Sequence, residues 1–310
     1  MIPDLAISSC WNSSHHEDGY AMMTELAELG FNSVELGHGT RYSLWPGILQ
    51  AHQEKIVRIV SLHNFCPLPL GFTRPSPNCY EFSDPRPQQR ARALKHSLET
   101  IDHAAAFGAR SVVLHLGSTG QRPASRPLEQ LYHRGRFLSR SYVKTKLHSV
   151  IAHEAWLKNH WPRIEDSLLE LLAKAASLNI QLGLECREAI EEVPLDSAWL
   201  EILTKLPPPA GYWHDFGHAA RKDALGYIDH EQHLSELAPR LIGCHLHDMI
   251  APDRDHQPLG TGGIPFAKLW PLLKKAPSPP VYVLELSPRV TKDAVRESLL
   301  WWKQNGPDLY

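Results

Sequence analysis

The sequence predicts an α/β fold in which eight parallel β-strands close into a (β/α)8 barrel. Short apolar runs alternate with segments whose apolar residues recur at spacings of three and four, as in βα units. The 310 residues suit one barrel of about 250 residues with additional segments. The carboxyl ends of barrel strands form active sites, and seven side chains that bind metals or transfer protons lie at the ends of these runs. These are His63, His115, Glu185, Asp215, His245, His247 and Glu285.

Eight segments are predicted to be strands because they are short, largely apolar and rich in β-branched residues. They cover residues 5–9, 33–36, 56–63, 111–116, 181–185, 211–215, 241–246 and 281–286. Helices are predicted between them, where apolar residues line one face of a helix. These helices cover residues 17–29, 86–107, 164–178, 195–206, 230–237, 266–275 and 291–303. A weaker helical pattern at 41–54 is interrupted by Pro46 and Gly47.

Residues 118–161 are predicted to be a helical insertion after strand 4. A polar loop at 120–127 precedes a segment rich in basic and aromatic residues, whose apolar spacing suits a helical hairpin. A long connection at this end of a barrel lies near the active site, as a lid, a partner surface or a packing helix. We therefore predict one domain over residues 1–310 that contains this insertion, with a homo-oligomer as an open alternative.

Composition excludes several classes of partner. Lys and Arg total 32 against 34 Asp and Glu, so the net charge of −2 gives no broad positive field to attract nucleic acid or anionic lipid. The odd number of cysteines, five, without a CxxC pair, predicts reduced thiols and a cytoplasmic location. The amino-terminal segment has neither a basic region nor a long apolar stretch, so neither a signal peptide nor a membrane span is expected.

Two of the strand-terminal carboxylates call for a cation. Glu185 and Glu285 each follow a mainly apolar strand, and a buried carboxylate without a partner costs several kcal/mol. Asp215 and His245 end the two strands between them. An oxygen-rich set with one imidazole suits Mn²⁺, Mg²⁺, Co²⁺ or Zn²⁺.

Seven segments, in order along nearly the whole chain, resemble the xylose isomerase-like TIM barrel superfamily, in particular its sugar phosphate isomerase/epimerase branch. They are SLHNFCPLP, VVLHLGS, LGLECRE, GYWHDFGH, IGCHLHD, DHQPLGTG and VLELSPR. The resemblance implies a carbohydrate substrate and one divalent metal held by Glu185, Asp215, His245 and Glu285. It also implies that both glutamates transfer protons and that His218 helps to hold substrate oxygens.

The implied chemistry is isomerisation or epimerisation of a sugar or sugar phosphate. A metal that binds a carbonyl and the neighbouring hydroxyl acidifies the C–H group between them, because it stabilises the enediolate charge. Carboxylates on the two sides of the sugar can then remove and return the proton. The same ligands serve an isomerase, an epimerase or a dehydratase, so they do not choose among these reactions.

Other readings of the same residues stay open. His63, His115 and His218 match the trinuclear zinc site of endonuclease IV-type enzymes, but Arg254 stands where that pattern needs an acid two residues before His256. A multi-iron oxidase could use an equivalent cluster. A sensor or scaffold protein would be expected to lack one of the four metal positions, and none is lost. A second metal or the substrate is predicted to bind to residues from the set His63, His115, His218, His256, Arg187 and Arg289.

Three further side chains, His247, Glu35 and Arg187, lie near the predicted site. His247 is expected to point away from the site, since side chains alternate along a strand and His245 points inward. Glu35, near the end of the second strand, is either a substrate contact or a buried partner of another charge. Arg187 is either a partner of a substrate anion or a partner of Glu188 or another acid.

Overall fold

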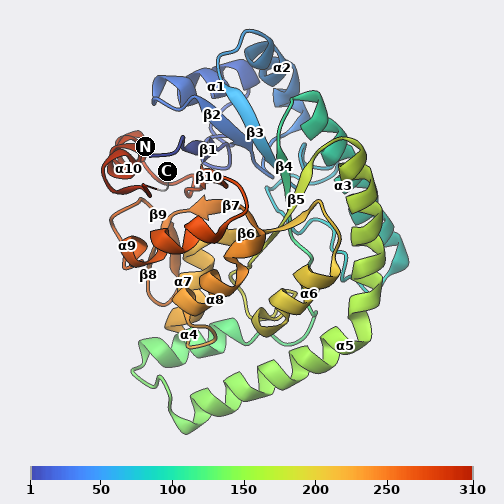
Figure 1. Ribbon diagram of the computed structural model, residues 1–310, viewed down its shortest axis with the longest axis vertical. Coiled ribbons are helices and arrows are strands. Elements are labelled where there is room, and N and C mark those ends of the chain that lie inside the picture. Colours follow the sequence, from blue (N-terminus) through green and yellow to red (C-terminus); the bar gives the residue numbers. More distant parts are fainter. Residues whose placement is uncertain (1, 309–310) are drawn as a thin grey trace.

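Over residues 2–308, which this computed structural model describes, eight parallel strands close into one barrel (Figure 1). The order around the ring is β1-β10-β7-β6-β5-β4-β3-β2. The barrel strands are β1 (Ala6–Ser8), β2 (Ser33–Leu36), β3 (Arg58–His63), β4 (Ser111–Leu114), β5 (Gln181–Glu185), β6 (Ala210–Asp215), β7 (Leu241–Leu246) and β10 (Val281–Leu284). The predicted (β/α)8 fold is confirmed.

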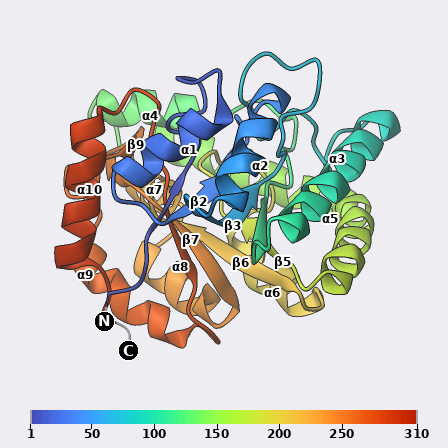
Figure 2. The same ribbon diagram turned by 90° about the horizontal axis from the view of Figure 1, so that it is seen from above.

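Helices surround the barrel on its outside (Figure 2). They are α1 (Gly19–Glu28), α2 (Trp45–Gln53), α3 (Pro87–Ala106), α4 (Ser125–His133), α5 (Arg140–Ser177), α6 (Trp199–Lys205), α7 (Phe216–Ala224), α8 (His230–Leu237), α9 (Phe266–Leu269) and α10 (Lys292–Asn305). Short 3-10 turns cover Tyr42–Leu44, Asp196–Ala198, Ala238–Arg240 and Trp270–Lys275. Side chains of Asp18 and Thr291 accept backbone N–H groups at the first turns of α1 and α10, which is typical N-capping.

Two features of the structure are absent from the sequence-based prediction. Helix α7 directly follows β6, and the carboxylate of Asp215 caps it by accepting the N–H of His218 at 2.7 Å. A two-stranded antiparallel hairpin, β8 (Asp248–Ile250) and β9 (Arg254–Gln257), follows β7. Helix α7 and the hairpin are short, and each begins almost directly after an apolar strand. Their apolar residues therefore show too little periodicity to predict them.

The connection between β4 and β5 holds α4 and the long helix α5. Figure 1 shows α5 running from α4 along the outside of the barrel towards α3. Helices α4 and α5 follow each other across a short turn, but the predicted break before a separate barrel helix at 164–178 is wrong, because α5 continues for 38 residues through Pro162. A proline inside a helix removes one backbone hydrogen bond but does not always end it. The description of residues 118–161 as an insertion within a single domain stays a prediction.

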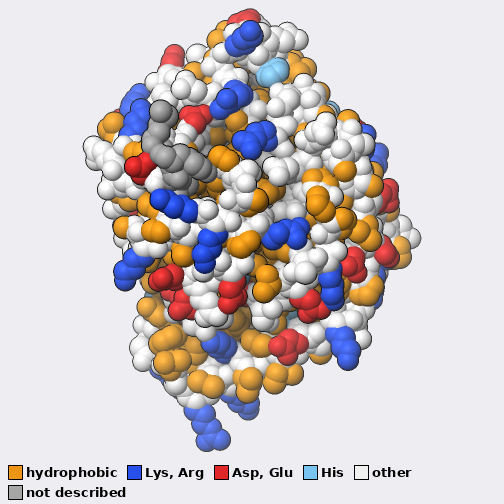
Figure 3. All heavy atoms as spheres, viewed as in Figure 1, with side chains coloured by type: hydrophobic (Ala, Val, Ile, Leu, Met, Phe, Trp, Pro, Cys, Tyr) orange, Lys and Arg blue, Asp and Glu red, His pale blue; other side chains and the backbone are white. Residues whose placement is uncertain are grey.

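No helix in the described part of the chain is both long and apolar enough to span a membrane. The surface over α4 and α5, in the lower part of Figure 3, presents hydrophobic side chains together with Lys and Arg.

The barrel interior is filled by a layer of buried side chains, three of which lie two residues before a titratable residue at a strand end. The members of this layer, which form one buried cluster, are Ala6, Val60, Val113, Trp213, Ile242, Val281 and Val283. Because side chains alternate along a strand, a residue two positions further on faces the same side. His115, Asp215 and Glu285 follow Val113, Trp213 and Val283 in this way, so they face the barrel interior at its carboxyl end.

Trp213 fits into this layer because the neighbouring strands have glycine beside it. A Cβ at Gly243 would lie 2.1 Å from Trp213 Cζ3, and one at Gly183 would lie 2.8 Å from Trp213 Cε3. The indole is fully buried and cannot move away without displacing the layer. Gly183 and Gly243 also lie two residues before Glu185 and His245. The packing of Trp213 against these glycines therefore helps to set how far both side chains lie from it along the barrel axis.

We expect Gly243→Ala to lower the free energy of unfolding by about 1–3 kcal/mol, since the new methyl group overpacks the barrel interior. Gly263→Ala is the matched control, because the nearest atom to its added Cβ would lie 3.9 Å away. Denaturant titration of both variants measures the difference. Equal unfolding midpoints for the two would show that Trp213 does not constrain this strand.

Candidate active site

Four predicted residues meet at the carboxyl ends of four neighbouring strands. Glu185 ends β5, Asp215 ends β6, His245 lies on β7 opposite Asp215, and Glu285 follows β10. All four are buried, with exposed fractions of 4% or less. One ligand atom from each lies within 4.8 Å of the others. The sequence therefore located this group correctly, while the role of its members stays a prediction.

The imidazole of His245 lies between two sets of acceptors. Its Nε2 is 3.1 Å from Glu35 Oε1, and Glu35 also accepts the hydroxyl of Ser61 at 2.8 Å. Its Nδ1 is 3.3 Å from both Glu185 Oε1 and Glu285 Oε2. Because Nε2–H donates to Glu35, it is Nδ1 that faces the carboxylates, with a proton in the absence of a metal ion and with a lone pair when a metal ion displaces that proton. Of the two alternatives for Glu35, the structure favours a buried partner of His245.

The charges of this group demand a cation. Burial raises the pKa of Glu185, but His115, Arg187 and His245 outweigh it and hold that pKa well below its usual range. Burial lowers the pKa of His245, whereas the carboxylates of Glu285, Glu35 and Glu185 raise it well above the ordinary value. The carboxylates are thus ionised and attract positive charge to Nδ1. Three carboxylates and one imidazole with a fixed tautomer fit a divalent metal ion.

A second group shares Glu185. The Nε2 atoms of His63 and His115 lie 3.2 Å and 2.5 Å from Glu185 Oε2. Their Nδ1 atoms lie 3.1 Å from the Asn64 carbonyl and 3.1 Å from Asn78 Oδ1, and both of these oxygens accept hydrogen bonds. When both rings carry their proton on Nδ1 alone, the two Nε2 lone pairs face one carboxylate oxygen. Without a cation Glu185 raises the pKa of His63 and so favours a proton on its Nε2. A second cation bridged by Glu185 fits this geometry.

The neutral state of His115 agrees with this arrangement. Burial and the positive charge of Arg187 lower the pKa of His115 to about 3. A neutral imidazole is the form that binds metals.

Three further histidines, His218, His247 and His256, form a third group with ligand atoms within 4.8 Å of one another. His218 Nδ1 donates to the Cys186 carbonyl at 3.1 Å, and His256 Nδ1 lies 3.1 Å from Asp255 Oδ1. The Nε2 atom of His218 is left for a sugar hydroxyl or a metal, whereas that of His256 lies 3.8 Å from Glu285 Oε2. The predicted residues His218 and His256 are therefore beside the four-residue group.

The expectation that His247 points away from the site is wrong. Its Nε2 lies 3.1 Å from Asp215 Oδ1, and its Nδ1 accepts the backbone N–H of His256 at 2.8 Å. Strand β7 ends at Leu246, so the alternation of side chains no longer applies one residue later. Gly217 makes the room, because a Cβ there would lie 1.9 Å from His247 Cε1.

The two predicted arginines have different surroundings. Arg187 is largely buried, and its guanidinium pairs with Glu185 at 3.3 Å and Glu192 at 3.0 Å. It therefore pairs with acids of the protein other than Glu188, which leaves open whether it also meets a substrate anion. Arg289 is exposed, and within residues 2–308 its guanidinium forms no ion pair or hydrogen bond. The structure does not bring Arg289 into the group.

A buried charge network joins α4 to the site. Arg221 on α7 pairs with Glu129 of α4 at 2.5 Å, with Glu188 at 2.6 Å and with Asp255 at 3.4 Å. Asp255 holds His256, whose Nε2 is 3.8 Å from Glu285 Oε2. One arginine thus links the helix between β4 and β5 to a side chain beside the carboxylates.

Sequence reasoning missed His38, Cys10 and Asn78. The imidazole of His38 packs edge-to-face against that of His63, with 5.0 Å between the ring centroids. Its Nδ1 lies 3.4 Å from Cys10 Sγ. Cys10, His38 and Glu285 also place ligand atoms within 4.8 Å of one another. The available signal was position, since His38 follows the end of β2 by two residues.

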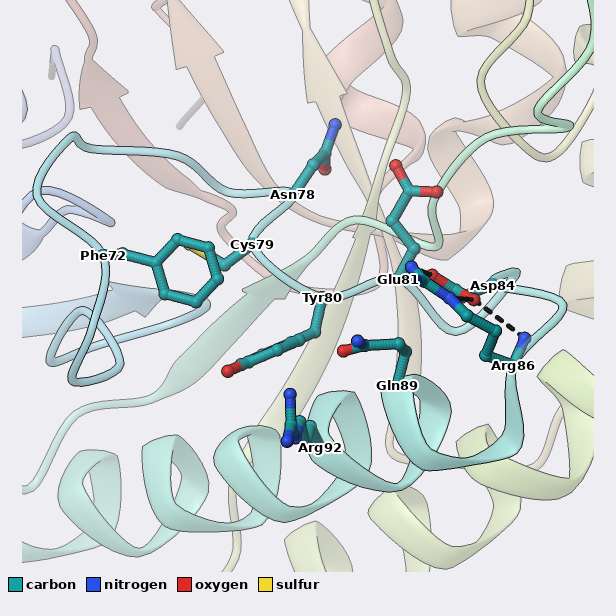
Figure 4. A pocket seen from close by; sticks show the side chains of 9 residues that line it. All are labelled: Phe72, Asn78, Cys79, Tyr80, Glu81, Asp84, Arg86, Gln89 and Arg92. Carbon is teal, nitrogen blue, oxygen red and sulfur yellow. Dashed lines mark hydrogen bonds and ion pairs between the residues drawn. The ribbon is translucent and has the colours of Figure 1, made fainter.

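Asn78 belongs to a loop that forms a separate pocket of about 320 Å³ beside His115 (Figure 4). The pocket is lined by Phe72, Asn78, Cys79, Tyr80, Glu81, Asp84, Arg86, Gln89 and Arg92. The loop is held to the start of the β4–α4 connection, because Glu81 accepts the hydroxyl of Ser118 at 3.0 Å. Asn78 and the pocket wall therefore orient His115.

We expect Glu35→Gln to weaken binding of Mn²⁺ about 10- to 100-fold, because the negative charge that raises the basicity of His245 is lost while the shape is kept. Calorimetric titration of Mn²⁺ measures the affinity. Glu28→Gln, on the exposed face of α1, is the control and should bind as the unmodified protein does. An unchanged affinity in Glu35→Gln would remove this carboxylate from the metal environment.

The comparisons with known proteins agree with the fold. A family model described as xylose isomerase-like TIM barrel matches residues 23–305. Comparison with curated proteins finds no match. Three solved structures, each under 20% identical, share the architecture.

The first of these is a D-tagatose 3-epimerase-like protein, with a TM-score of 0.68, 19% identity and 97% coverage of both chains. The second, 3-keto-D-glucoside 4-epimerase from E. coli, has a TM-score of 0.65 and 16% identity, covering 97% of this chain and 99% of the other. The third is the protein IolI with a bound zinc atom, with a TM-score of 0.64 and 12% identity, covering 97% of this chain and 96% of the other.

Proposed function

Because the chain belongs to the xylose isomerase-like TIM barrel family, we propose that it is a divalent-metal-dependent isomerase or epimerase of a sugar or sugar phosphate. Neighbours in structure are sugar epimerases, and one neighbour binds zinc. The ion at this site would be Mn²⁺, Co²⁺, Zn²⁺ or Mg²⁺, held by Glu185, Asp215, His245 and Glu285.

One observation carries the proposal. Nδ1 of His245 faces Glu185 and Glu285 at 3.3 Å and Asp215 at 3.8 Å, while Glu35 fixes the proton on the opposite nitrogen. Such a group of ionised carboxylates needs a balancing positive charge, which is either a proton on Nδ1 of His245 or a bound metal ion. It is also the donor set that a divalent ion prefers.

The residues divide the work of proton transfer and substrate binding. A bound divalent cation supplies the positive charge that stabilises a carbonyl oxygen while a neighbouring carbon loses its proton. Glu185 and Glu285 accept and return that proton at their carboxylate oxygens. Arg187 keeps Glu185 ionised, since its guanidinium lies 3.3 Å from Glu185 Oε1. His218 and His256 hold hydroxyl groups of the sugar through Nε2.

The test is exchange of a carbon-bound hydrogen. The Mn²⁺-loaded protein is incubated in D₂O with a panel of ketohexoses and their phosphates, and deuterium next to the carbonyl is followed by NMR. We expect incorporation that stops when the metal is chelated and returns when Mn²⁺ is added. Absence of exchange across the panel with fully loaded protein would reject the proposal.

A second candidate is a multinuclear enzyme on the same barrel, either an endonuclease IV-like zinc phosphodiesterase or a multi-iron oxidase. The group His63, His115 and Glu185 favours it, because two imidazole lone pairs converge on one carboxylate oxygen. The group of His218, His247 and His256 offers a third position. The net charge of −2 weighs against DNA as the substrate.

Counting metals separates the two candidates. Metal analysis together with anomalous diffraction at the absorption edge would give one ion per chain for the isomerase or epimerase. Two or three ions would support the multinuclear candidate, and bound iron would favour the oxidase.

A further inference from the structure

Two side chains that the proposed function does not use, Cys10 and His38, lie beside Glu285. Cys10 follows the end of β1 by two residues, His38 follows the end of β2 by two residues, and Glu285 directly follows β10. Strand β1 lies between β2 and β10 in the barrel, so the three carboxyl ends are neighbours. One ligand atom from each residue lies within 4.8 Å of the others. A thiol, an imidazole and a carboxylate therefore converge at one place on the rim of the barrel.

The spacing of the thiol and the imidazole suits a tetrahedral metal ion. Cys10 Sγ lies 3.4 Å from His38 Nδ1. A zinc ion binds sulfur at about 2.3 Å and an imidazole nitrogen at about 2.0 Å, which at a tetrahedral angle places the two atoms about 3.5 Å apart. The pair thus already has the separation of two zinc ligands. The carboxylate of Glu285, only 4% exposed, lies within reach as the third ligand.

The loops that carry Cys10 and His38 are fixed against each other. A Cβ at Gly37 would lie 2.3 Å from Cys10 Sγ, so a side chain there would exclude the thiol from its place. The N–H of Gly37 donates to Ser9 Oγ at 2.8 Å, and the ring of His38 packs edge-to-face against that of His63. Cys10 and His38 are both partly exposed, so an ion can reach them from solvent.

The set of ligand atoms selects the kind of ion. Thiolate is a soft ligand that binds Zn²⁺ or Co²⁺ better than Mn²⁺ or Mg²⁺, which prefer oxygen. A metal ion binds the thiolate form, so binding at Cys10 releases the thiol proton. Glu285 contacts the imidazoles of His245 and His256 through Oε2, at 3.3 Å and 3.8 Å. A carboxylate has two acceptor oxygens, so Glu285 can bind a further ion through Oε1.

We propose that Cys10, His38 and Glu285 bind a thiophilic divalent cation such as Zn²⁺, separate from the ion of the four-residue group. A water molecule completes the tetrahedron. Glu285 then no longer accepts a proton from the substrate, so excess Zn²⁺ inhibits the enzyme. This inhibition rests on the proposed function, whereas the binding of the ion does not. Because Mn²⁺ prefers oxygen, the site adds no ion to the Mn²⁺-loaded protein.

The probe is Co²⁺, which resembles Zn²⁺ in size and gives a sulfur-to-metal charge-transfer band only when a thiolate is a ligand. Titration of Co²⁺ into the full-length, Mn²⁺-loaded protein should produce a saturable band, which added Zn²⁺ abolishes. The band should be absent in Cys10→Ser. In His38→Asn the Co²⁺ affinity read from the band should fall at least about 100-fold, since losing a ligand costs more than losing a hydrogen bond that supports one.

Cys79→Ser is the matched control, because Cys79 is also a partly exposed free thiol but lies in the loop after β3. It should keep the band and the affinity of the unmodified protein. No band, a band that persists in Cys10→Ser, or equal Co²⁺ affinity in His38→Asn and the unmodified protein would overturn the proposal. The last of these results would mean that the thiol alone binds the ion.

Deuterium exchange into the sugar measures the inhibition. The Zn²⁺ concentration that halves the exchange rate of each protein should be at least about tenfold higher in Cys10→Ser than in Cys79→Ser or the unmodified protein. Equal inhibition of all three would show that Zn²⁺ acts at other ligands and would overturn the inhibitory role. If none of the three exchanges deuterium, the proposed function fails, and the charge-transfer band alone decides whether the site binds the ion.

Discussion

Glu185→Gln and Glu285→Gln are each expected to reduce turnover by at least about a thousandfold, since in the proposed mechanism each carboxylate both transfers a proton and holds the metal ion. Glutamine keeps the shape of glutamate but cannot accept a proton at physiological pH. Steady-state rates on the sugar found by deuterium exchange measure the loss. The fold should persist, because both side chains lie at strand ends above the packed interior layer.

Glu297→Gln is the control for these variants. It lies on the exposed face of α10, so its activity should equal that of the unmodified protein. Circular dichroism of all three variants checks the fold. A glutamine variant that keeps its turnover and its metal would take that residue out of the mechanism, whatever the other variant does.

Arg221→Met is expected to lower the free energy of unfolding by about 3–5 kcal/mol, because it leaves buried carboxylates without their cation. The guanidinium is 14% exposed and pairs with Glu129, Glu188 and Asp255. Denaturant unfolding measures the change. Activity should fall as well, since Asp255 would no longer be held where it orients His256.

The matched control for this network is Arg296→Met. Its partner Asp293 and its own side chain are 86% and 52% exposed, and a pair in water contributes less than about 1 kcal/mol. If Arg221→Met were as mild as Arg296→Met, then the ions of the network would be solvated and α4 would not depend on them.

The barrel could be predicted because each strand is a short apolar run with a clear end in the sequence. Strands β2, β5 and β7 have the predicted bounds, since apolar runs end there at loops. The juxtaposition of Glu185, Asp215, His245 and Glu285 follows from the same logic, because parallel strands bring their carboxyl ends together. Helix α5 could not be predicted at its full length, since Pro162 is normally a stop signal and only tertiary packing overrides it.

The finer structure of the site depends on contacts that no local pattern contains. His247 faces Asp215 because strand β7 ends at Leu246 and because Gly217 leaves space for the imidazole. Neither cause is visible in the pattern of apolar and polar residues. Glu35 and Asn78 fix the tautomers of His245 and His115 from distant segments. Such pairings depend on the complete fold. The sequence therefore predicts which residues meet at the site, but not which ring nitrogen of each histidine has the proton.

The position of Trp213 inside the barrel limits how a ligand can reach the candidate site. Its indole, with the buried side chains around it, closes the cylinder beneath the carboxylates. In the proposed enzyme, substrate and product would therefore both use the entrance at the carboxyl end of the barrel. Product that lingers there blocks the next molecule, and the kinetics should show product inhibition that is purely competitive with substrate.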